Sequence, residues 1–231
     1  MATRLSARLL RRSLGLAVLS LGLSHAAFAD DAKAPTPSFT PPTVAVIAPT
    51  VTAPVDQLMN IGPLPDLVQG SPTATNTIIE YASMTCTHCA AFHDSTWGEL
   101  KSKYIDSGRV KFILREFPLD PLATAAFMLG RCAGADKRNL LIDQLFTQQK
   151  TWAFVEKPIE PLLAMVKTIG FTQTDFETCL RNQDLYEQVS QSRERAAEAF
   201  NIDSTPTFFV NGRKLTGELS IVDFDKALET H

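Results

Sequence analysis

The sequence lacks the hallmarks of several common protein classes. Its 22 Lys and Arg residues are outnumbered by 25 Asp and Glu, giving a net charge of -3, so no basic surplus is present to neutralise nucleic-acid phosphates. No apolar run approaches the roughly 20 residues that a membrane-spanning helix needs. None of the 4 cysteines precedes Cys86, which excludes the amino-terminal cysteine of an exported lipoprotein. The composition therefore argues against a nucleic-acid partner and a lipid anchor.

The first 29 residues have the pattern of a secretory signal peptide. Four arginines precede an apolar run from Leu14 to Leu23, and Ala27-Phe28-Ala29 then supplies a small-residue cleavage site. The alternative is a membrane anchor, for which the run is short. Cleavage would remove four Arg and no acidic residue, changing the net charge from -3 to -7. We expect export to the periplasm, an oxidising compartment in which thiols tend to form disulfides.

Residues 30–56 are dominated by Ala, Pro and Thr. This composition is typical of a flexible linker, and a proline-rich docking segment is the alternative. We expect folded sequence to begin near Leu58, in a single domain of residues 57–231.

The first half of that domain predicts a strand, a helix and a second strand. Residues 77–82 are rich in β-branched and aromatic side chains, and residues 110–117 repeat that character before Pro118. A helix is expected between them, from about Cys89 to Lys103. This order predicts a parallel pair joined by a right-handed crossover.

Residues 120–200 contain no convincing strand and predict a helical subdomain, with start signals at Asp120-Pro121 and a capping box at residues 174–177. Asn211-Gly212 then predicts the two-residue turn of a β-hairpin, followed by a capped helix from about Ser220. The expected fold class is α/β, with one mixed sheet and an inserted helical subdomain.

The motif Cys86-Thr87-His88-Cys89 lies where the first strand passes into a helix. There, unpaired backbone N–H groups and the helix dipole favour a thiolate at Cys86. His88 is a potential cation or hydrogen-bond donor within reach of that sulfur. Cys89, one helical turn later, would be the resolving thiol that closes a redox-active disulfide.

Three other interpretations of the cysteine pair are weaker. A structural disulfide there would close a very short loop and gain little stability. A zinc site using His88 or His93 would need further ligands, but no second Cys-x-x-Cys or His-x-x-x-His follows. A haem attachment site needs His after the second cysteine, where Ala90 stands. We therefore expect no metal and no cofactor.

The segments Glu80–Cys89 and Ser204–Gly212 together resemble the DsbA-type thiol oxidases of bacterial periplasms, and the likeness extends from about Leu58 to the C-terminus. The resemblance implies a thioredoxin-like fold interrupted by a helical domain. It also implies donation of a disulfide to newly exported proteins, with reoxidation by a quinone-linked membrane partner of the DsbB type. The protein is expected to be a monomer.

Position by position, the resemblance makes Cys86 the nucleophile and Cys89 the resolving cysteine, with Pro206 a cis-proline facing the sulfurs. Thr205 would then offer a backbone edge to a substrate strand. Glu80 matches a buried acid that moves a proton as Cys89 reacts, although a strand-end carboxylate in water is the alternative. Thr87 departs from the commonest oxidising motif, which has Pro there, and the intervening dipeptide tunes the redox potential.

Two further expectations concern the rest of the domain. Cys132 and Cys179, 47 positions apart, are predicted to form a structural disulfide, with a second redox pair as the alternative. Met84, beside the motif, is predicted to be partly exposed as part of a substrate surface. Other functions left open are a disulfide isomerase or reductase, and a metal chaperone that would use Cys86, Cys89 and His93.

Overall fold

The computed structural model describes residues 53–60 and 62–229. The predicted signal peptide and residues 30–52 of the predicted linker lie outside the described residues. Leu58, near which folded sequence was expected to begin, is buried, while Ala53 is also buried and helix α1 (Val55–Met59) starts two residues before the predicted boundary at residue 57. Within the described part of the chain, no helix combines the length and hydropathy needed to cross a bilayer.

A five-stranded mixed sheet in the order β1-β3-β2-β4-β5 forms the centre of the fold. The central strands β2 and β3 run parallel, and the other neighbours are antiparallel. Ile79 of β2 lies opposite Ile113 on one side and Phe209 on the other. The strands are β1 (Val68–Gln69), β2 (Asn76–Ala82), β3 (Val110–Glu116), β4 (Thr207–Val210) and β5 (Arg213–Thr216).

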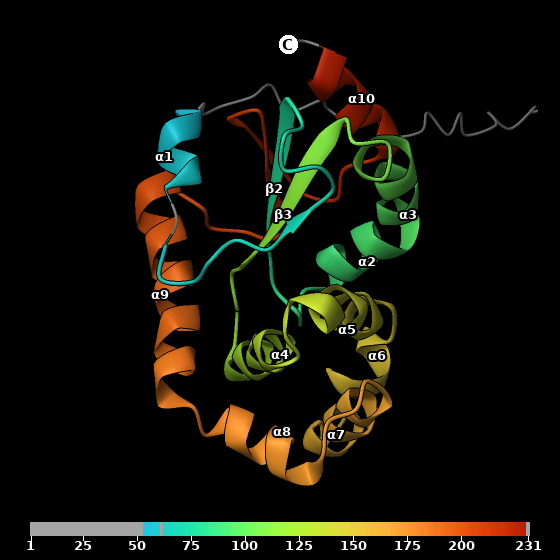
Figure 1. Cartoon of the computed structure of the whole chain (residues 1–231), viewed down its shortest axis with the longest axis vertical. Coiled ribbons are helices and arrows are strands. Elements are labelled where there is room, and N and C mark those ends of the chain that lie inside the picture. The colour runs from blue at the N-terminus through green and yellow to red at the C-terminus, as the bar shows by residue number, and fades with distance from the viewer. Residues whose placement is uncertain (1–52, 61, 230–231) are drawn as a thin grey trace, which may run out of the picture. The chain divides into compact units, whose positions relative to one another are not determined.

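Helices cover both faces of this sheet (Figure 1). Ile79, Tyr81 and Phe209 pack with residues of α1 and of α9 (Gln183–Phe200), whereas Ile78 and Phe208 belong to the larger core on the opposite face. Alternate residues of β2 and β4 therefore enter different cores, as the pleat requires. This double coverage explains why β2 is buried almost throughout.

The helix that follows β2 is broken where the sequence predicts one continuous helix. The structure has α2 (Thr87–Ser95), α3 (Trp97–Leu100) and a π-helical turn, η1 (Lys101–Ile105). Thr96 separates α2 from α3, with φ near -120° and ψ near -36°. Its β-branched side chain lowers its helix propensity, in keeping with this position outside the regular helix.

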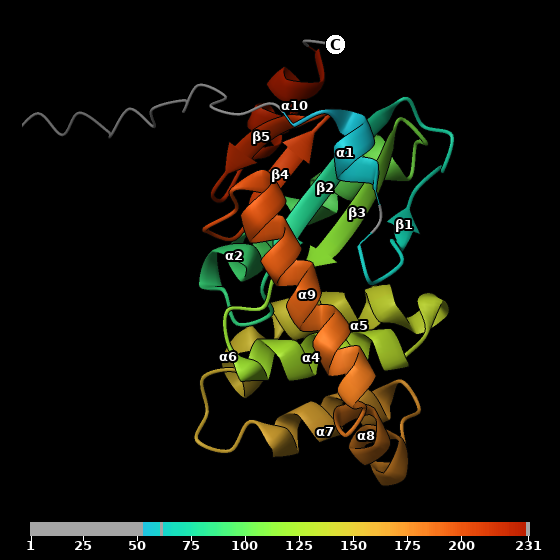
Figure 2. The ribbon, with the colours of Figure 1, turned by 90° about the vertical axis from the view of Figure 1, so that its left-hand side faces the viewer.

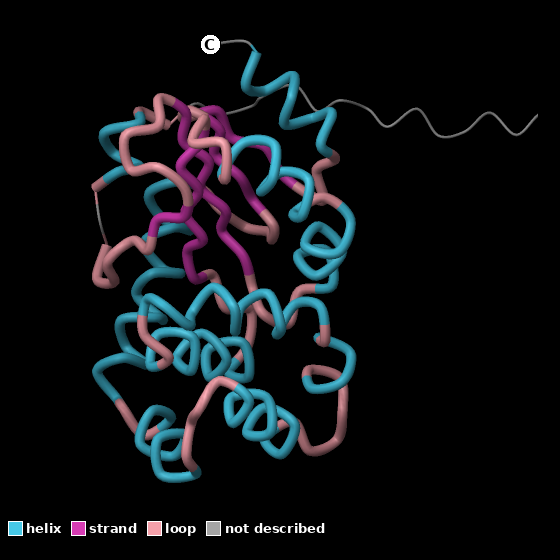
Figure 3. The backbone as a smooth tube through the Cα atoms, turned by 45° about the vertical axis from the view of Figure 1, so that its right-hand side comes forward, coloured by secondary structure: helices cyan, strands magenta, loops and turns pink. Residues whose placement is uncertain are grey.

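Six helices, α4 to α9, connect β3 to β4. Asp120 begins α4 as predicted, since its carboxylate accepts a hydrogen bond from the Ala123 N–H at 2.8 Å and Pro121 is the first helical residue. Figures 2 and 3 show these helices gathered beyond one end of the sheet, with α9 returning alongside it. Their bounds are α4 (Pro121–Cys132), α5 (Ala135–Thr147), α6 (Gln149–Trp152), α7 (Ile159–Thr168), α8 (Gln173–Leu180) and α9 (Gln183–Phe200).

The predicted capping box in this region is misplaced by two residues. Helix α8 is capped by Thr172, whose hydroxyl accepts from the Asp175 N–H while the Asp175 carboxylate accepts from the Thr172 N–H. The sequence offers overlapping patterns here, and the one beginning at Thr172 pairs both side chains reciprocally.

A buried ionic cluster fastens the end of β3 to these helices. The Glu116 carboxylate accepts from Arg131 at 2.7 Å and from Arg138 at 3.0 Å. Burial alone would raise the pKa of Glu116, but the two guanidinium groups outweigh it and lower that pKa. The carboxylate therefore stays ionised inside the protein.

The C-terminal part of the fold follows the local sequence signals. Asn211 and Gly212 have φ of 48° and 87°, which is the left-handed geometry that the tight turn between β4 and β5 requires. Helix α10 (Ile221–Glu229) follows Ser220, which exchanges hydrogen bonds with Asp223.

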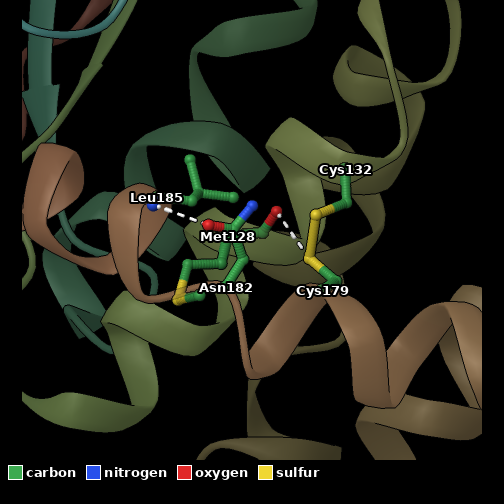
Figure 4. The surroundings of a disulfide bond; sticks show 5 residues. All are labelled: Met128, Cys132, Cys179, Asn182 and Leu185. Atoms are coloured by element: carbon green, nitrogen blue, oxygen red, sulfur yellow. Dashed lines mark hydrogen bonds between the residues drawn. A yellow bond between two sulfur atoms is a disulfide. The ribbon is translucent and has the colours of Figure 1, made fainter.

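A disulfide joins Cys132 at the end of α4 to Cys179 in α8 (Figure 4). The Met128 carbonyl oxygen lies 3.2 Å from the Cys179 sulfur, a contact without a shared proton because a disulfide sulfur carries none. Nearby, Asn182 begins α9 by accepting from the Leu185 N–H at 3.0 Å. The bridge thus lies just before the turn that starts the longest helix of the subdomain.

Removing this bridge should destabilise the fold without touching the reactive motif. In the chain-entropy model a bridge across 47 positions contributes up to about 4 kcal/mol. The double variant Cys132→Ala/Cys179→Ala is expected to lose that much free energy of unfolding in urea titrations while keeping its circular dichroism spectrum. An unchanged unfolding midpoint would contradict a structural role.

Candidate active site

The two cysteines of the motif occupy the start of α2, directly beyond the carboxyl end of β2. Cys86 is the N-cap residue, and its sulfur accepts a hydrogen bond from the Cys89 N–H at 3.4 Å. Cys86 is 8% exposed and Cys89 is fully buried. Both are free thiols in this structure, so the geometry is that of the reduced protein.

The Cys86 thiol is strongly acidified. Hydrogen bonding from the Cys89 thiol is the largest cause, and it overcomes the opposing effect of burial. The Thr205 side chain and the backbone N–H groups of Cys89 and His88 add smaller contributions, and together these groups lower the pKa of Cys86 to about 5. Cys86 is therefore a thiolate at neutral pH.

Cys89 has the opposite character. Burial raises its pKa well above 9, and the neighbouring Cys86 and Glu80 raise it further. At neutral pH Cys89 keeps its proton. One helical turn thus holds a thiolate and a thiol, which are the species needed for attack and for later resolution.

The Thr205-Pro206 peptide is cis, and it lies against the sulfurs just before β4. The Cys86 thiol donates to the Thr205 carbonyl oxygen at 3.2 Å, an interaction that ends when the thiol ionises. Thr205 is only 9% exposed. The reactive sulfur therefore lies between the start of α2 and the backbone segment that leads into β4.

The two residues between the cysteines point outward. The side chains of Thr87 and His88 are exposed, and the His88 imidazole lies 3.8 Å from the Glu218 carboxylate. No hydrogen bond between that imidazole and either sulfur is present among the described residues. His88 lowers the pKa of Cys86 through its backbone N–H, whereas the sequence suggested that its imidazole ring would interact with the sulfur.

Met84 is fully buried, so the prediction of a partly exposed side chain was wrong. Its thioether belongs to the main core, and its carbonyl oxygen accepts from Gln149. The chain turns inward before the motif, which leaves no substrate surface at this side chain.

Glu80 lies on β2 beneath the motif and is fully buried, which rules out the alternative of a strand-end carboxylate in water. Its Oε2 atom lies 3.3 Å from Nε2 of His93 in α2, and the His93 side chain is itself only 2% exposed. His93 therefore pairs with an acid rather than with the cysteines. No group of three or more His, Cys, Asp or Glu able to hold a metal occurs among the described residues.

Gln149 of α6 is a site residue that the sequence did not indicate. Its buried side-chain amide donates to the carbonyl oxygens of Met84 and Cys86, both at 2.9 Å. Asp120 also holds the connection between β2 and α2, because its carboxylate accepts a hydrogen bond from the Thr85 hydroxyl. The helical subdomain thereby fixes the segment that carries Cys86, through contacts that no sequence motif announces.

A family model described as Thioredoxin matches residues 64–230. The chain belongs to the thioredoxin family. This membership and the sheet order confirm the predicted thioredoxin-like fold class.

Relatives within the thioredoxin family indicate which kind of thioredoxin-like protein this chain resembles. Two proteins named as protein-disulfide oxidoreductases, from Rickettsia conorii and Rickettsia felis, are 34% and 33% identical over 71% of this chain. The chain spans about three-fifths of their length, 61% and 60%. The crystal structure of Wolbachia pipientis alpha-DsbA1 superposes with a TM-score of 0.69 and 28% identity, covering 76% of this chain and 94% of that one. The expected DsbA-type resemblance is confirmed.

The acidity of Cys86 can be tested against its cause. Thiolate absorbance of the reduced protein should titrate with a midpoint near 5. Cys89→Ala should raise that midpoint because it removes the main hydrogen-bond donor, whereas Cys89→Ser should keep it low. An equal midpoint in both variants would contradict the assignment.

The same depression predicts a pH dependence of stability. The unfolded thiol has a pKa near 8.5, so ionisation stabilises the folded reduced protein fully above that pH. This contribution should decline as the pH falls and vanish below about 5. Urea unfolding of reduced protein between pH 5 and 9 measures it, with Cys86→Ser as the variant that lacks the dependence.

Gln149→Leu should loosen the site from a distance. The Met84 carbonyl oxygen loses its hydrogen-bond donor, at a cost of roughly 1–3 kcal/mol, whereas the Cys86 carbonyl oxygen keeps the Ala90 N–H at 3.2 Å. The free energy of unfolding is expected to fall by roughly 1–3 kcal/mol, with a shifted Cys86 titration. The exposed neighbour Gln148 supplies the control Gln148→Leu, and equal effects of the two changes would refute the role.

Proposed function

We propose that this protein is a periplasmic thiol-disulfide oxidoreductase that donates the Cys86-Cys89 disulfide to newly exported cysteine-containing proteins. The single observation that carries the proposal is the opposite ionisation of the two sulfurs. The pKa of Cys86 is lowered to about 5, while that of Cys89 is raised well above 9. A sulfur that is stable as a thiolate is a good leaving group, so the reduced form is favoured and the disulfide is an oxidant.

The exchange proceeds in two steps. A substrate thiolate attacks the Cys86 sulfur of the oxidised protein, the Cys86–Cys89 bond breaks, and Cys89 leaves with the electron pair and takes up a proton. A second substrate thiolate then attacks the substrate sulfur of the mixed disulfide and releases Cys86 as its stable thiolate. The substrate gains a disulfide, and the protein gains two electrons and one proton.

Surrounding residues take supporting roles in this scheme. The backbone edge at Thr205, beside Pro206, would pair with the substrate strand in an extended conformation. Glu80 would exchange the proton that Cys89 gains and loses. Thr87 and the exposed His88 would tune the redox potential of the Cys86-Cys89 pair. Each 1.4 kcal/mol by which such interactions stabilise the Cys86 thiolate would raise that potential by about 30 mV.

The sequence supports the proposed cellular setting. An N-terminal pattern typical of export favours an oxidising compartment, in which unfolded exported proteins would be the clients. The reduced protein would be reoxidised by a quinone-linked membrane partner of the DsbB type. We propose that the protein acts as a monomer, with its reactive sulfur available to one client at a time.

The redox potential of the pair tests the direction of exchange. A thiol with a pKa near 5 is more acidic than that of thioredoxin, near 7. We therefore expect a potential between about -270 mV, the value for thioredoxin, and about -120 mV, the value for DsbA. Equilibration of the protein (residues 30–231) with glutathione buffers measures it, with Cys86→Ser as the blank.

Activity on a dithiol peptide completes the test. The oxidised protein should convert a peptide with two thiols to its disulfide, while Cys86→Ser should be inactive. A potential at or below about -270 mV, together with slow peptide oxidation, would overturn the donor role and favour a reductase or an isomerase.

A further inference from the structure

Glu80 and His93 form an isolated pair beneath the reactive motif. Glu80 Oε2 lies 3.3 Å from His93 Nε2, and both side chains are almost completely removed from solvent. The imidazole stacks on Phe146 with ring centres 4.1 Å apart, and Trp97 lies against it at 5.3 Å. This packing holds the ring in one orientation, with a single nitrogen engaged by the carboxylate.

Each member of the pair has one free polar atom. Glu80 Oε1 and His93 Nδ1 are buried without a hydrogen-bond partner among the described residues. Leaving a buried polar atom unsatisfied costs roughly 1–3 kcal/mol, so two such atoms in one pair need a reason. Atoms that must accept and release a proton in turn cannot be permanently occupied.

Cys89 supplies the proton that such atoms could carry. It is fully buried, and each turn of the exchange requires it to gain a proton and later lose one. Glu80 is near enough to raise the pKa of Cys89, but Glu80 is also fully buried. A proton accepted by Glu80 therefore needs a further acceptor before the next cycle.

Two acidic groups interact with His93: Glu80 of β2 contacts its imidazole, and Asp143 of α5 is affected by it electrostatically. Asp143 is partly exposed. Burial raises the pKa of Asp143, while His93 and a hydrogen bond with Trp97 lower it. Lys101 of η1 also acts on Asp143, so the series of groups reaches the surface beside a cation.

We propose that His93 is a positioning residue that passes the Cys89 proton between Glu80 and Asp143. The proposed relay runs from the Cys89 thiol to Glu80, across the Oε2 to Nε2 contact to His93, and then by way of the partly exposed Asp143 to water. The inference rests on the proposed function, because it concerns the protonation of the resolving cysteine. It adds a route by which a sealed thiol exchanges protons with solvent.

Reoxidation by glutathione disulfide isolates the step that needs the relay. The Cys86 thiolate attacks the oxidant, forming a mixed disulfide and releasing one glutathione thiolate. Cys89 then gives its proton to Glu80, and its thiolate attacks the Cys86 sulfur. The intramolecular disulfide forms, and the second glutathione leaves with the electron pair. Only this second step moves the Cys89 proton.

Acid quenching followed by mass spectrometry follows both steps in His93→Gln, which keeps an N–H donor but cannot relay a proton. Attack by Cys86 should be unchanged. Resolution at pH 7 should slow about tenfold, less than the full effect of a positioned base because Glu80 remains, so the mixed disulfide accumulates. The deficit should shrink toward pH 9, where hydroxide competes for the proton. Resolution at the wild-type rate would overturn the relay.

Further variants separate the relay from packing and from the proposed function. The double variant Glu80→Gln/His93→Gln should resolve no more slowly than Glu80→Gln alone, because the loss of Glu80 already interrupts a relay whose groups act in series. An additive loss would contradict the relay. Val166→Ala in α7, which removes packing from the same hydrophobic core, should lower thermal stability without slowing resolution. If His93→Gln does not fold, Asp143→Asn must slow resolution by itself, or the relay fails. Wild-type protein that consumes no glutathione disulfide would refute the proposed function instead.

Discussion

The fold depends on the place where β2 ends and α2 begins. Cys86 must cap the helix for its sulfur to meet the Cys89 N–H, and a start one residue later would place another side chain there. The short connection is held by contacts along its length. Ser83 accepts from the Leu119 N–H, Thr85 donates to Asp120, and Gln149 occupies the carbonyl groups on both sides. The chemistry of the sulfur is thus set by how firmly one turn is fixed.

The helical subdomain is part of the active site in this respect. Asp120 and Gln149, which hold the connection, both come from the segment between β3 and β4. The same segment supplies Phe146, which stacks on the buried His93. The Glu116 cluster and the Cys132-Cys179 bridge hold these helices to β3 and to each other. Rigidity far from Cys86 is therefore a condition for the geometry at Cys86.

Features that depend on neighbouring residues could be predicted from the sequence, whereas features that depend on contacts between distant segments could not. Asp120-Pro121 and Asn211-Gly212 are local signals whose geometry needs few outside contacts, and both were placed correctly. The burial of Met84 and the role of Gln149 depend on a contact across 65 positions, for which no pattern exists. The capping box at Thr172 was missed because overlapping patterns compete, and only the folded backbone selects between them.

Two buried carboxylates differ in how completely their oxygens are paired. Glu116 receives two guanidinium groups at 2.7 and 3.0 Å, so its charge is neutralised and the ionised form is favoured. Glu80 receives one imidazole and keeps an oxygen unsatisfied. A fully paired carboxylate stabilises a fold, whereas a half-paired one retains the capacity to change its protonation. The half-paired Glu80 lies beneath Cys89, the cysteine that must gain and lose a proton in the proposed exchange.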